Sequence, residues 1–164
     1  MKSLFLYSGP LMIALLAGGC GKPEWKEFSS AEGKFKVLFP GTPKSEKRAA
    51  GPMTLTAHGA EVRNGVYMVS YGDLPAGSPF DYSKSIQGMA GPWGGNVLSE
   101  TDVTVEGAKG KGFEMEVTSP RKGYATGRIV VINGRLYQIF ALGSDMRASN
   151  ADVQKFLDSF KLIK

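Results

Sequence analysis

The sequence predicts an α+β domain in which a twisted, largely antiparallel sheet of about seven strands is flanked by helices, in the order βββ-α-ββββ-α. Three observations carry this prediction. Short apolar segments alternate with polar residues and end at Gly, Pro or Asn-Gly, which is typical of strands and hairpins. Two segments repeat apolar residues at helical spacing. Several strands are apolar on both faces, so layers must cover both sides of the sheet.

The composition bounds the class of protein before any motif is considered. The chain has 164 residues and a formal net charge of +5, and this length predicts about one domain. Hydrophobic residues make up 42% and charged residues 21% of the chain, which is typical of a globular protein. The single Cys and single His exclude an internal disulfide framework, a Cys-rich zinc site and a multi-histidine metal centre. We therefore expect no metal site and no cofactor.

Residues 1–19 have the layout of a secretory signal peptide. Lys2 precedes an uncharged apolar run that ends at Ala17, and this run is shorter than the roughly 20 residues of a membrane-spanning helix. The segment from Ala17 to Cys20 resembles the lipobox of bacterial lipoproteins, although Ala17 stands where that family more often has Leu. In that family the chain is cut before the cysteine and the thiol carries a diacylglyceryl group. A plain secreted form or an uncleaved anchor are the alternatives.

This resemblance makes Cys20 the expected lipid attachment site and residues 20–24 a lipidated tether. Gly21 follows the cysteine where Asp would resemble an inner-membrane retention signal. The expected location is therefore the bacterial cell envelope, lipid-anchored, with the periplasmic side of the outer membrane favoured. The inner membrane or the cell surface remain open. The membrane is thus an expected partner through the anchor.

The sequence pattern in the first half of the domain predicts three strands. Residues 34–39 alternate, with the odd-numbered residues on one apolar face, and Pro40 ends the strand. Residues 44–48 read as a polar crossing. Residues 53–62 form the second strand, in which the apolar phase shifts near Gly59 and predicts a β-bulge. Asn64-Gly65 then predicts a hairpin to a central strand.

The first helix and the next strands follow from caps and alternation. Ser78 caps a helix that runs to about Met89 or Ala90. Strands are expected at residues 97–105 and 112–118. The second of these places Glu114 and Glu116 on one solvated face, which is typical of a sheet edge.

The last elements have the strongest local signals. Two strands around Asn133-Gly134 form a central hairpin. Ser149 and Asp152 form a capping pair for a final helix. The apolar stripe of that helix consists of Val153, Phe156, Leu157 and Phe160.

Together these features resemble the PsbP-like families of α/β/α sandwich domains. The resemblance rests on Trp25 followed by Phe28, on the strand that closes as Pro-Gly-Thr-Pro at residues 40–43, on the element order, and on the ending at residues 155–162. It covers residues 25–164 and implies a single domain there. The best-known members are non-catalytic, among them a photosystem subunit, a binder of a small GTPase and lipoproteins resembling DcrB. Fold alone is a weak basis for function.

Candidate chemical groups are few. His58 has no nucleophile elbow to serve and is expected to be structural or solvent-facing. Glu114 and Glu116 are expected to be solvated rather than a catalytic pair. Residues 107–112 lack the spacing of a phosphate-binding loop and predict a hairpin turn. Trp93, among glycines and a proline, is a candidate partner contact or a lid on the core.

Two functions remain from the sequence. The first is a non-catalytic binding or accessory module of the cell envelope, held at the membrane by lipid, with an envelope protein or an anionic lipid as partner. No catalytic residue is expected, and nucleic acid is a poor target outside the cytoplasm. The alternative is an envelope hydrolase that uses carboxylate or serine chemistry. That alternative requires His58, Glu114 and Glu116 to converge with an acid in one pocket.

Overall fold

The computed structural model describes residues 23–163. The expected signal peptide and Cys20 therefore lie outside the described residues. The strands are β1 (Trp25–Ser30), β2 (Phe35–Pro40), β3 (Lys44–Ala50), β4 (Met53–Val62), β5 (Gly65–Asp73), β6 (Asn96–Val105), β7 (Ala108–Val117), β8 (Gly123–Ile132), β9 (Arg135–Gly143) and β10 (Lys161–Leu162). The helices are α1 (Tyr82–Ala90), α2 (Ala151–Ser159) and the short 3₁₀ helix η1 (Gly91–Trp93).

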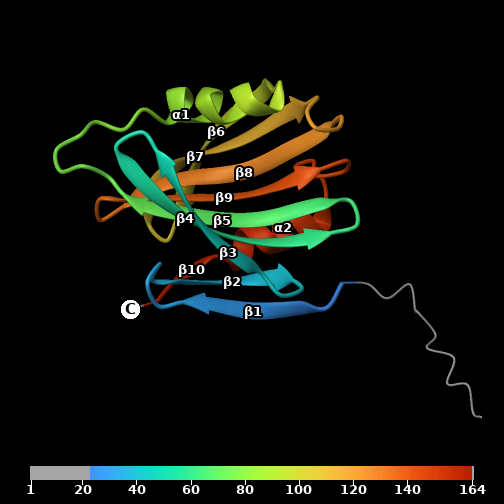
Figure 1. Cartoon of the computed structure of the whole chain (residues 1–164), viewed down its shortest axis with the longest axis horizontal. Helices are drawn as coiled ribbons and strands as arrows, with labels where there is room; N and C mark the ends of the chain where they lie inside the picture. Colours follow the sequence, from blue (N-terminus) through green and yellow to red (C-terminus); the bar gives the residue numbers. More distant parts are fainter. Residues whose placement is uncertain (1–22, 164) are drawn as a thin grey trace, which may run out of the picture.

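The strands form two sheets. The large sheet has seven antiparallel strands in the order β3-β4-β5-β9-β8-β7-β6, and the small sheet has three in the order β1-β2-β10. In Figure 1, α1 lies above the large sheet, and the small sheet lies below it together with α2. The predicted α+β sandwich with a seven-stranded, largely antiparallel sheet is confirmed.

One core lies between the large sheet and the layer made of α2 and the small sheet, and it is rich in aromatic rings. Phe35 is fully buried, and its ring stacks on Phe160 with 5.5 Å between ring centroids. Phe156 of α2 contacts Phe39 of β2 and Tyr67 of β5 through rings 5.4 and 5.2 Å apart. These rings join β2, α2 and the large sheet into one packed unit.

The other core lies between α1 and the large sheet, and it consists mainly of aliphatic side chains and methionine. Ile86 of α1 and Met115 of β7 are fully buried there. Ile129 of β8 and Phe140 of β9 extend this core under the helix. Both cores and every described element lie within residues 25–162.

The structure has three strands that the sequence did not predict. The expected cover at residues 25–28 is strand β1, and β10 is a two-residue strand that pairs with β2. The expected polar crossing at residues 44–48 is strand β3, an edge of the large sheet. The sequence predicted β2 as one of the seven strands of the large sheet. In the structure β2 lies in the small sheet, and β3 is the seventh strand of the large one. Its pattern was hidden because both of its faces are exposed and charged, which is how many edge strands avoid aggregation.

The predicted bulge at Gly59 is wrong. Strand β4 keeps a continuous register with both β3 and β5. Its apolar phase changes because its two faces meet different covers: Leu55 belongs to the core under α1, whereas Ala60 belongs to the aromatic core. When a strand is covered on one face along its first half and on the other face along its second half, its apolar residues change phase. A β-bulge produces the same sequence pattern.

Other details also differ from the predictions. Strand β7 is not an edge, because β6 pairs along its outer side. The N-cap of α1 is Asp81 rather than Ser78, and that of α2 is Asn150 rather than Ser149. Asp and Asn accept from backbone N–H groups at least as well as Ser. The hairpin at Asn133-Gly134 is as predicted, with both residues at positive φ.

Candidate functional site

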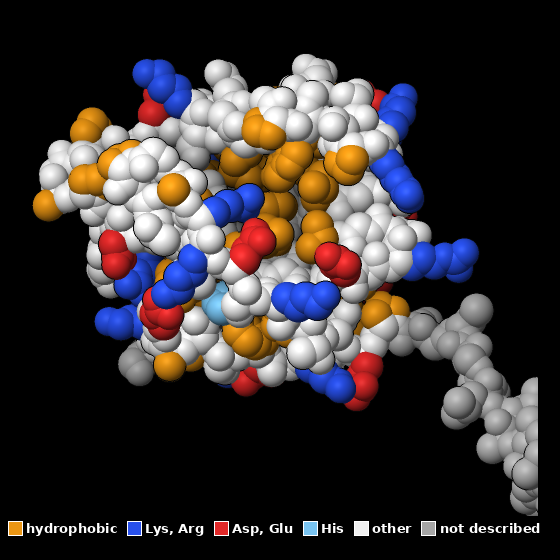
Figure 2. Space-filling view, viewed as in Figure 1, with side chains coloured by type: hydrophobic (Ala, Val, Ile, Leu, Met, Phe, Trp, Pro, Cys, Tyr) orange, Lys and Arg blue, Asp and Glu red, His pale blue; other side chains and the backbone are white. Residues whose placement is uncertain are grey.

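The face of the large sheet under α1 is covered over only half of its width. Helix α1 has nine residues and contacts β6 and β7. The part of this face that belongs to β4, β5 and β9 lies beyond the helix. Figure 2 shows hydrophobic side chains gathered there in a hollow, with charged side chains along its lower rim.

This apolar hollow has a volume of about 470 Å³. Its wall on one side comes from α1, η1 and the segment before them, and on the other side from β3, β4 and β9. Its main apolar lining residues are Met53, Leu55, Phe80, Met89, Trp93 and Phe140. The volume and the lining are those of a small-molecule site, which is typically an apolar cleft of roughly 300–1,000 Å³.

Small residues beside the hollow explain why the sheet does not fill it. The small residues are Ala57 and Gly59 of β4 and Ser70 of β5; Ala57 pairs with Ser70, whereas Gly59 pairs with the longer Met68. These residues share the face of Leu55, since side chains alternate along a strand. A Cβ atom on Gly59 would meet its nearest neighbours only at ordinary contact distance, 3.4 Å from Met68 Cε. The surface of β4 and β5 therefore stays low where α1 ends.

Trp93 of η1 packs against β9 on this face. Its ring is 5.5 Å from that of Phe140, and its side chain lines the apolar hollow while remaining partly exposed. Its carbonyl oxygen accepts hydrogen bonds from the N–H groups of Thr118 and Ser119, both at 3.0 Å. These bonds fix η1 against the loop after β7. The geometry combines the two roles considered from the sequence, a cover for Phe140 and an accessible aromatic ring; its role as a partner contact stays a prediction.

A buried polar pair is present here, in which Gln138 lines the hollow and Ser70 lies beside it on β5. The hydroxyl of Ser70 donates to Oε1 of Gln138 at 2.8 Å, and Nε2 of Gln138 lies 3.4 Å from the sulfur of Met89. Both polar residues are buried, and their mutual bond keeps the amide satisfied. At the rim, the guanidinium of Arg48 reaches the sulfur of Met68 at 3.9 Å. Methionine side chains adapt to ligands of different shape, so this wall can accommodate more than one apolar group.

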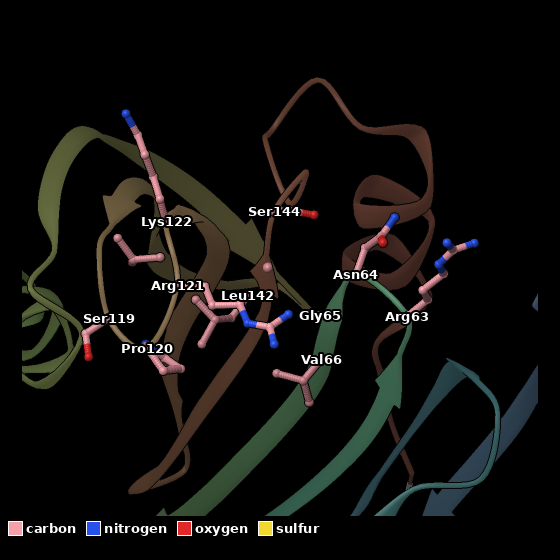
Figure 3. A pocket seen from close by; sticks show the side chains of 12 residues that line it. Arg63, Asn64, Gly65, Val66, Ser119, Pro120, Arg121, Lys122, Leu142 and Ser144 are labelled. Carbon is pink, nitrogen blue, oxygen red and sulfur yellow. The ribbon is translucent and has the colours of Figure 1, made fainter.

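A second hollow of about 360 Å³ lies at the end of the strands, between the β4–β5 turn and the loop after β7. We call it the basic hollow; its lining includes Arg63, Val66, Arg121, Lys122, Leu142 and Ser144. In Figure 3 the guanidinium of Arg121 points towards Gly65 and Leu142, and the ammonium of Lys122 points away.

The two hollows lie end to end along β9. Phe140 lines the apolar hollow and Leu142 lines the basic one, and both residues occupy the same face two positions apart. Met68 and Val66 stand opposite them on β5. From Leu136 to Leu142 this surface extends about 20 Å at the usual rise of a strand. We call the two hollows together the trough.

A third hollow, of about 390 Å³, adjoins the basic hollow at the β4–β5 turn and shares Arg63 and Asn64 with it. It is lined by Pro23, Asp145 and Asp152 among others. Burial, together with these two carboxylates, raises the pKa of Tyr67 beside it to about 12. Tyr67 is thus neutral at any physiological pH.

His58 is a buried structural residue and lies outside the trough. Its Nδ1 shares a hydrogen bond of 2.6 Å with the hydroxyl of Ser45, and Nε2 is buried without a partner among the described residues. The rings of Phe28 and Tyr71 are 4.8 and 5.9 Å away. Burial lowers the pKa of His58, and the carboxylate of Glu32 opposes that shift. Burial thus favours the neutral form of the imidazole.

The groups required by the hydrolase alternative do not converge. His58 is on β4 and the two glutamates are on β7, with β5, β9 and β8 between these strands. Glu114 accepts a hydrogen bond from the N–H of Ala148, and Glu116 forms an ion pair with Lys122. Both carboxylates thus have structural partners, although β7 is not the edge strand that was expected.

The remaining candidates are structural as well. Residues 108–111 of the glycine- and lysine-rich segment belong to strand β7 and pair with β6. The turn between these two strands is Glu106-Gly107. No group of three or more metal-ligating side chains occurs among residues 23–163. Within the same range no helix has the length and hydropathy needed to cross a membrane. Cys20 lies outside the described residues, so its acylation stays a prediction.

Sequence reasoning missed most of the trough. Met53 and Phe140 carry only the signal of ordinary core residues, and Arg121 was one of several basic residues in loops. One signal was present: small residues replace large ones on β4 and β5, beside strands that are otherwise apolar. It could suggest a low surface but not the position of α1 that leaves this surface open.

Comparison with known proteins places the fold. No family model matches the sequence, and no curated protein sequence is similar to it. Among solved structures, the chain is similar to the cyanobacterial PsbP protein CyanoP from Synechocystis, with a TM-score of 0.61 and 12% sequence identity. The match covers 88% of this chain and 96% of that chain. A likeness at this identity shows the fold alone, and the chain therefore has a PsbP-like fold.

Proposed function

We propose that this chain is a lipid-anchored, non-catalytic binding module of the bacterial cell envelope, and that the trough is its ligand site. The observation that carries the proposal is the open half of the face under α1. There Met53, Met89 and Trp93 are only partly buried around a hollow. Apolar side chains that line an uncovered concave surface mark a site for a ligand or partner.

The trough has features of binding rather than of group transfer. The uncharged polar side chains that line the apolar half are Ser85 of α1 and Gln138, and Gln138 is bonded to the neighbouring Ser70. The charged side chains of the trough lie at the rim and at the basic end. The imidazole and carboxylates that a hydrolase would use have structural partners elsewhere. A binding role therefore uses the residues that the trough offers.

The anchor is proposed from the sequence before the described domain. The segment from Ala17 to Cys20 resembles a lipobox, and the first described residue, Pro23, follows Cys20 by three positions. Three extended residues span about 10 Å. An acylated Cys20 would thus hold the domain directly at the membrane surface, and two or more acyl chains give stable anchoring.

Binding at the trough is tested with a neutral naphthylamine dye, whose fluorescence rises in apolar surroundings. The protein is the mature chain, residues 20–164, with Cys20→Ser, so that no acyl chain of its own can compete. We expect saturable binding that Trp93→Ala or Met53→Glu reduces at least fivefold. The matched controls are Trp25→Phe and Lys26→Glu on β1, which should leave binding unchanged. Binding that responds equally to both sets of variants would overturn the site.

The anchor is tested by mass spectrometry of the N-terminal peptide after expression of the full chain in a bacterium. We expect a peptide that begins at Cys20 and carries acyl mass. The Cys20→Ser chain should be released by a salt wash of the membranes. A mature chain that begins elsewhere, or that carries no acyl mass, would overturn the anchor and leave the trough untouched.

A further inference from the structure

The basic end of the trough differs from the rest of this face in its charge. The described residues that line the basic hollow include Arg63, Arg121 and Lys122 but no Asp or Glu. Lys122 pairs with Glu116, whereas neither Arg63 nor Arg121 forms an ion pair with any residue between 23 and 163. Of the two free arginines, Arg121 reaches across the hollow in Figure 3, and Arg63 points away from it.

Hydrogen-bond donors accompany this guanidinium. The hydroxyl of Ser144 points towards Asn64 in Figure 3, and both side chains line the same hollow. The turn that carries Asn64 is fixed by the hydrogen bond from Ser144 N–H to the Asn64 carbonyl, at 2.9 Å. A planar guanidinium in a hollow that is also lined by a hydroxyl and an amide matches a carboxylate, which arginine binds in a bidentate manner.

The apolar part of the trough begins directly beside this basic end. Val66 and Leu142 line the basic hollow, and Phe140 and Trp93 continue the apolar surface into the next hollow. The trough is about 20 Å long, whereas one leaflet of a bilayer has an acyl layer of about 15 Å. A single extended acyl chain and its head group therefore fit its length.

From this arrangement we propose that the trough binds a long-chain fatty acid, with the carboxylate at Arg121 and the acyl chain along β9 past Trp93. The inference deepens the proposed function and rests on the trough being the ligand site. The position of Pro23, the first described residue, agrees with this proposal. Pro23 lines the third hollow, which shares Arg63 and Asn64 with the basic hollow. An anchored domain would thus hold the basic end close to a source of acyl chains.

The test uses the fluorescence of Trp93 in the mature chain with Cys20→Ser and Trp25→Phe, which leaves Trp93 as its one tryptophan. Myristate is compared with myristyl alcohol, which has the same chain and no charge. We expect myristate to bind about fivefold more tightly at low salt, the range of one partly exposed charge pair. The difference should shrink in 0.5 M salt, where the Debye length is about half of its physiological value.

Variants at Arg121 separate the head group from the chain. Arg121→Gln should lower the affinity for myristate to that for the alcohol, and it should leave the affinity for the alcohol unchanged. Arg121→Lys should give an intermediate affinity, because it keeps the charge and loses the planar fork. Lys26→Gln on β1 is the matched control and should change neither ligand. Melting curves verify that each variant is folded.

Each other outcome decides the matter. If myristate and the alcohol bind equally and Arg121→Gln changes neither, the fatty-acid assignment is overturned while the apolar site stands. If an alkyl phosphate of the same length binds more tightly than myristate, the carboxylate assignment is overturned. If neither amphiphile nor the neutral dye binds, both the assignment and the proposed site are overturned.

Discussion

The two faces of the large sheet are built from different residues and are covered to different extents. The face towards α2 and the small sheet is filled by aromatic rings, and its residues Phe35, Val69 and Phe156 are fully buried. The face towards α1 has aliphatic and methionine side chains, and part of it lies open. The same strands thus carry a closed core on one side and an exposed apolar trough on the other.

The difference arises from the size of the covers. On the aromatic side the cover consists of α2 and the three strands β1, β2 and β10. The stacked rings of Phe35 and Phe160 pack β2 against the residue that follows α2. On the other side the single helix α1 runs along the strands in Figure 1, so it covers only about 10–12 Å, its own diameter, across them. A sheet of seven strands about 4.8 Å apart is roughly 30 Å wide. One helix cannot cover that width, so part of this face stays open.

The first comparison is between a substitution in the closed core and one in the trough, and we expect it to show the greatest difference in the free energy of unfolding. Phe35→Ala should lower the free energy of unfolding by about 3–5 kcal/mol, since its fully buried ring leaves a cavity. Met53→Ala should cost about 1 kcal/mol, because that side chain is already partly exposed. Denaturant titration of both variants measures the contrast. Equal losses would show that the trough is as tightly packed as the core.

A second contrast lies within the face under α1 and uses two glycines. A Cβ on Gly127, in the covered half, would lie 2.5 Å from Phe140 Cβ and 2.6 Å from the Ile139 carbonyl oxygen. We expect Gly127→Ala to destabilise by about 1–3 kcal/mol through overpacking. Gly59→Ala, beside the open half, should be neutral or stabilise by less than about 1 kcal/mol, since a strand loses less entropy with Ala. Thermal unfolding of both chains measures the difference, and a reversed order would contradict the assignment of the two halves.

A smaller effect concerns the wall of the trough. Asp81 caps α1 by accepting a hydrogen bond from the N–H of Lys84 at 3.0 Å. Asp81→Ala should destabilise by about 1 kcal/mol and Asp81→Asn by much less, because Asn also caps. The neutral dye should bind more weakly to the Ala variant as α1 frays. Unchanged stability in the Ala variant would show that packing alone fixes the helix.

The smallest expected effect is a pH dependence of the closed face. Burial lowers the pKa of His58 below its ordinary value of 6.5. The unfolded chain therefore binds the proton first, and stability present above about pH 6.5 declines as the pH falls below that value. Melting temperatures at pH 7.5 and pH 5.5 should show a smaller acid loss for His58→Gln than for the unchanged chain. An equal loss in both chains would assign the dependence to other groups.

The sequence predicted what periodicity encodes. The alternation in β2, the central strands β8 and β9, and the stripe of α2 were all readable because each buries one consistent set of side chains. Strand β3 was hidden because its residues from Lys44 to Ala49 are exposed on both faces. The trough could not be read from the sequence, since Met53 has the pattern of a core residue, Phe140 is a core residue, and only the lateral position of α1 leaves a hollow beside them.

Photo-crosslinking locates a bound ligand on the surface and so tests our proposal that the open half of the face under α1 is the ligand site. A neutral alkyl probe with a photoreactive diazirine is irradiated with the mature chain, and labelled peptides are identified by mass spectrometry. We expect saturable labelling of residues 80–93 and of the peptide that contains Phe140, which an unlabelled alkyl competitor removes. Labelling that instead concentrates on β1, β2 or α2, or that no competitor reduces, would contradict the claim.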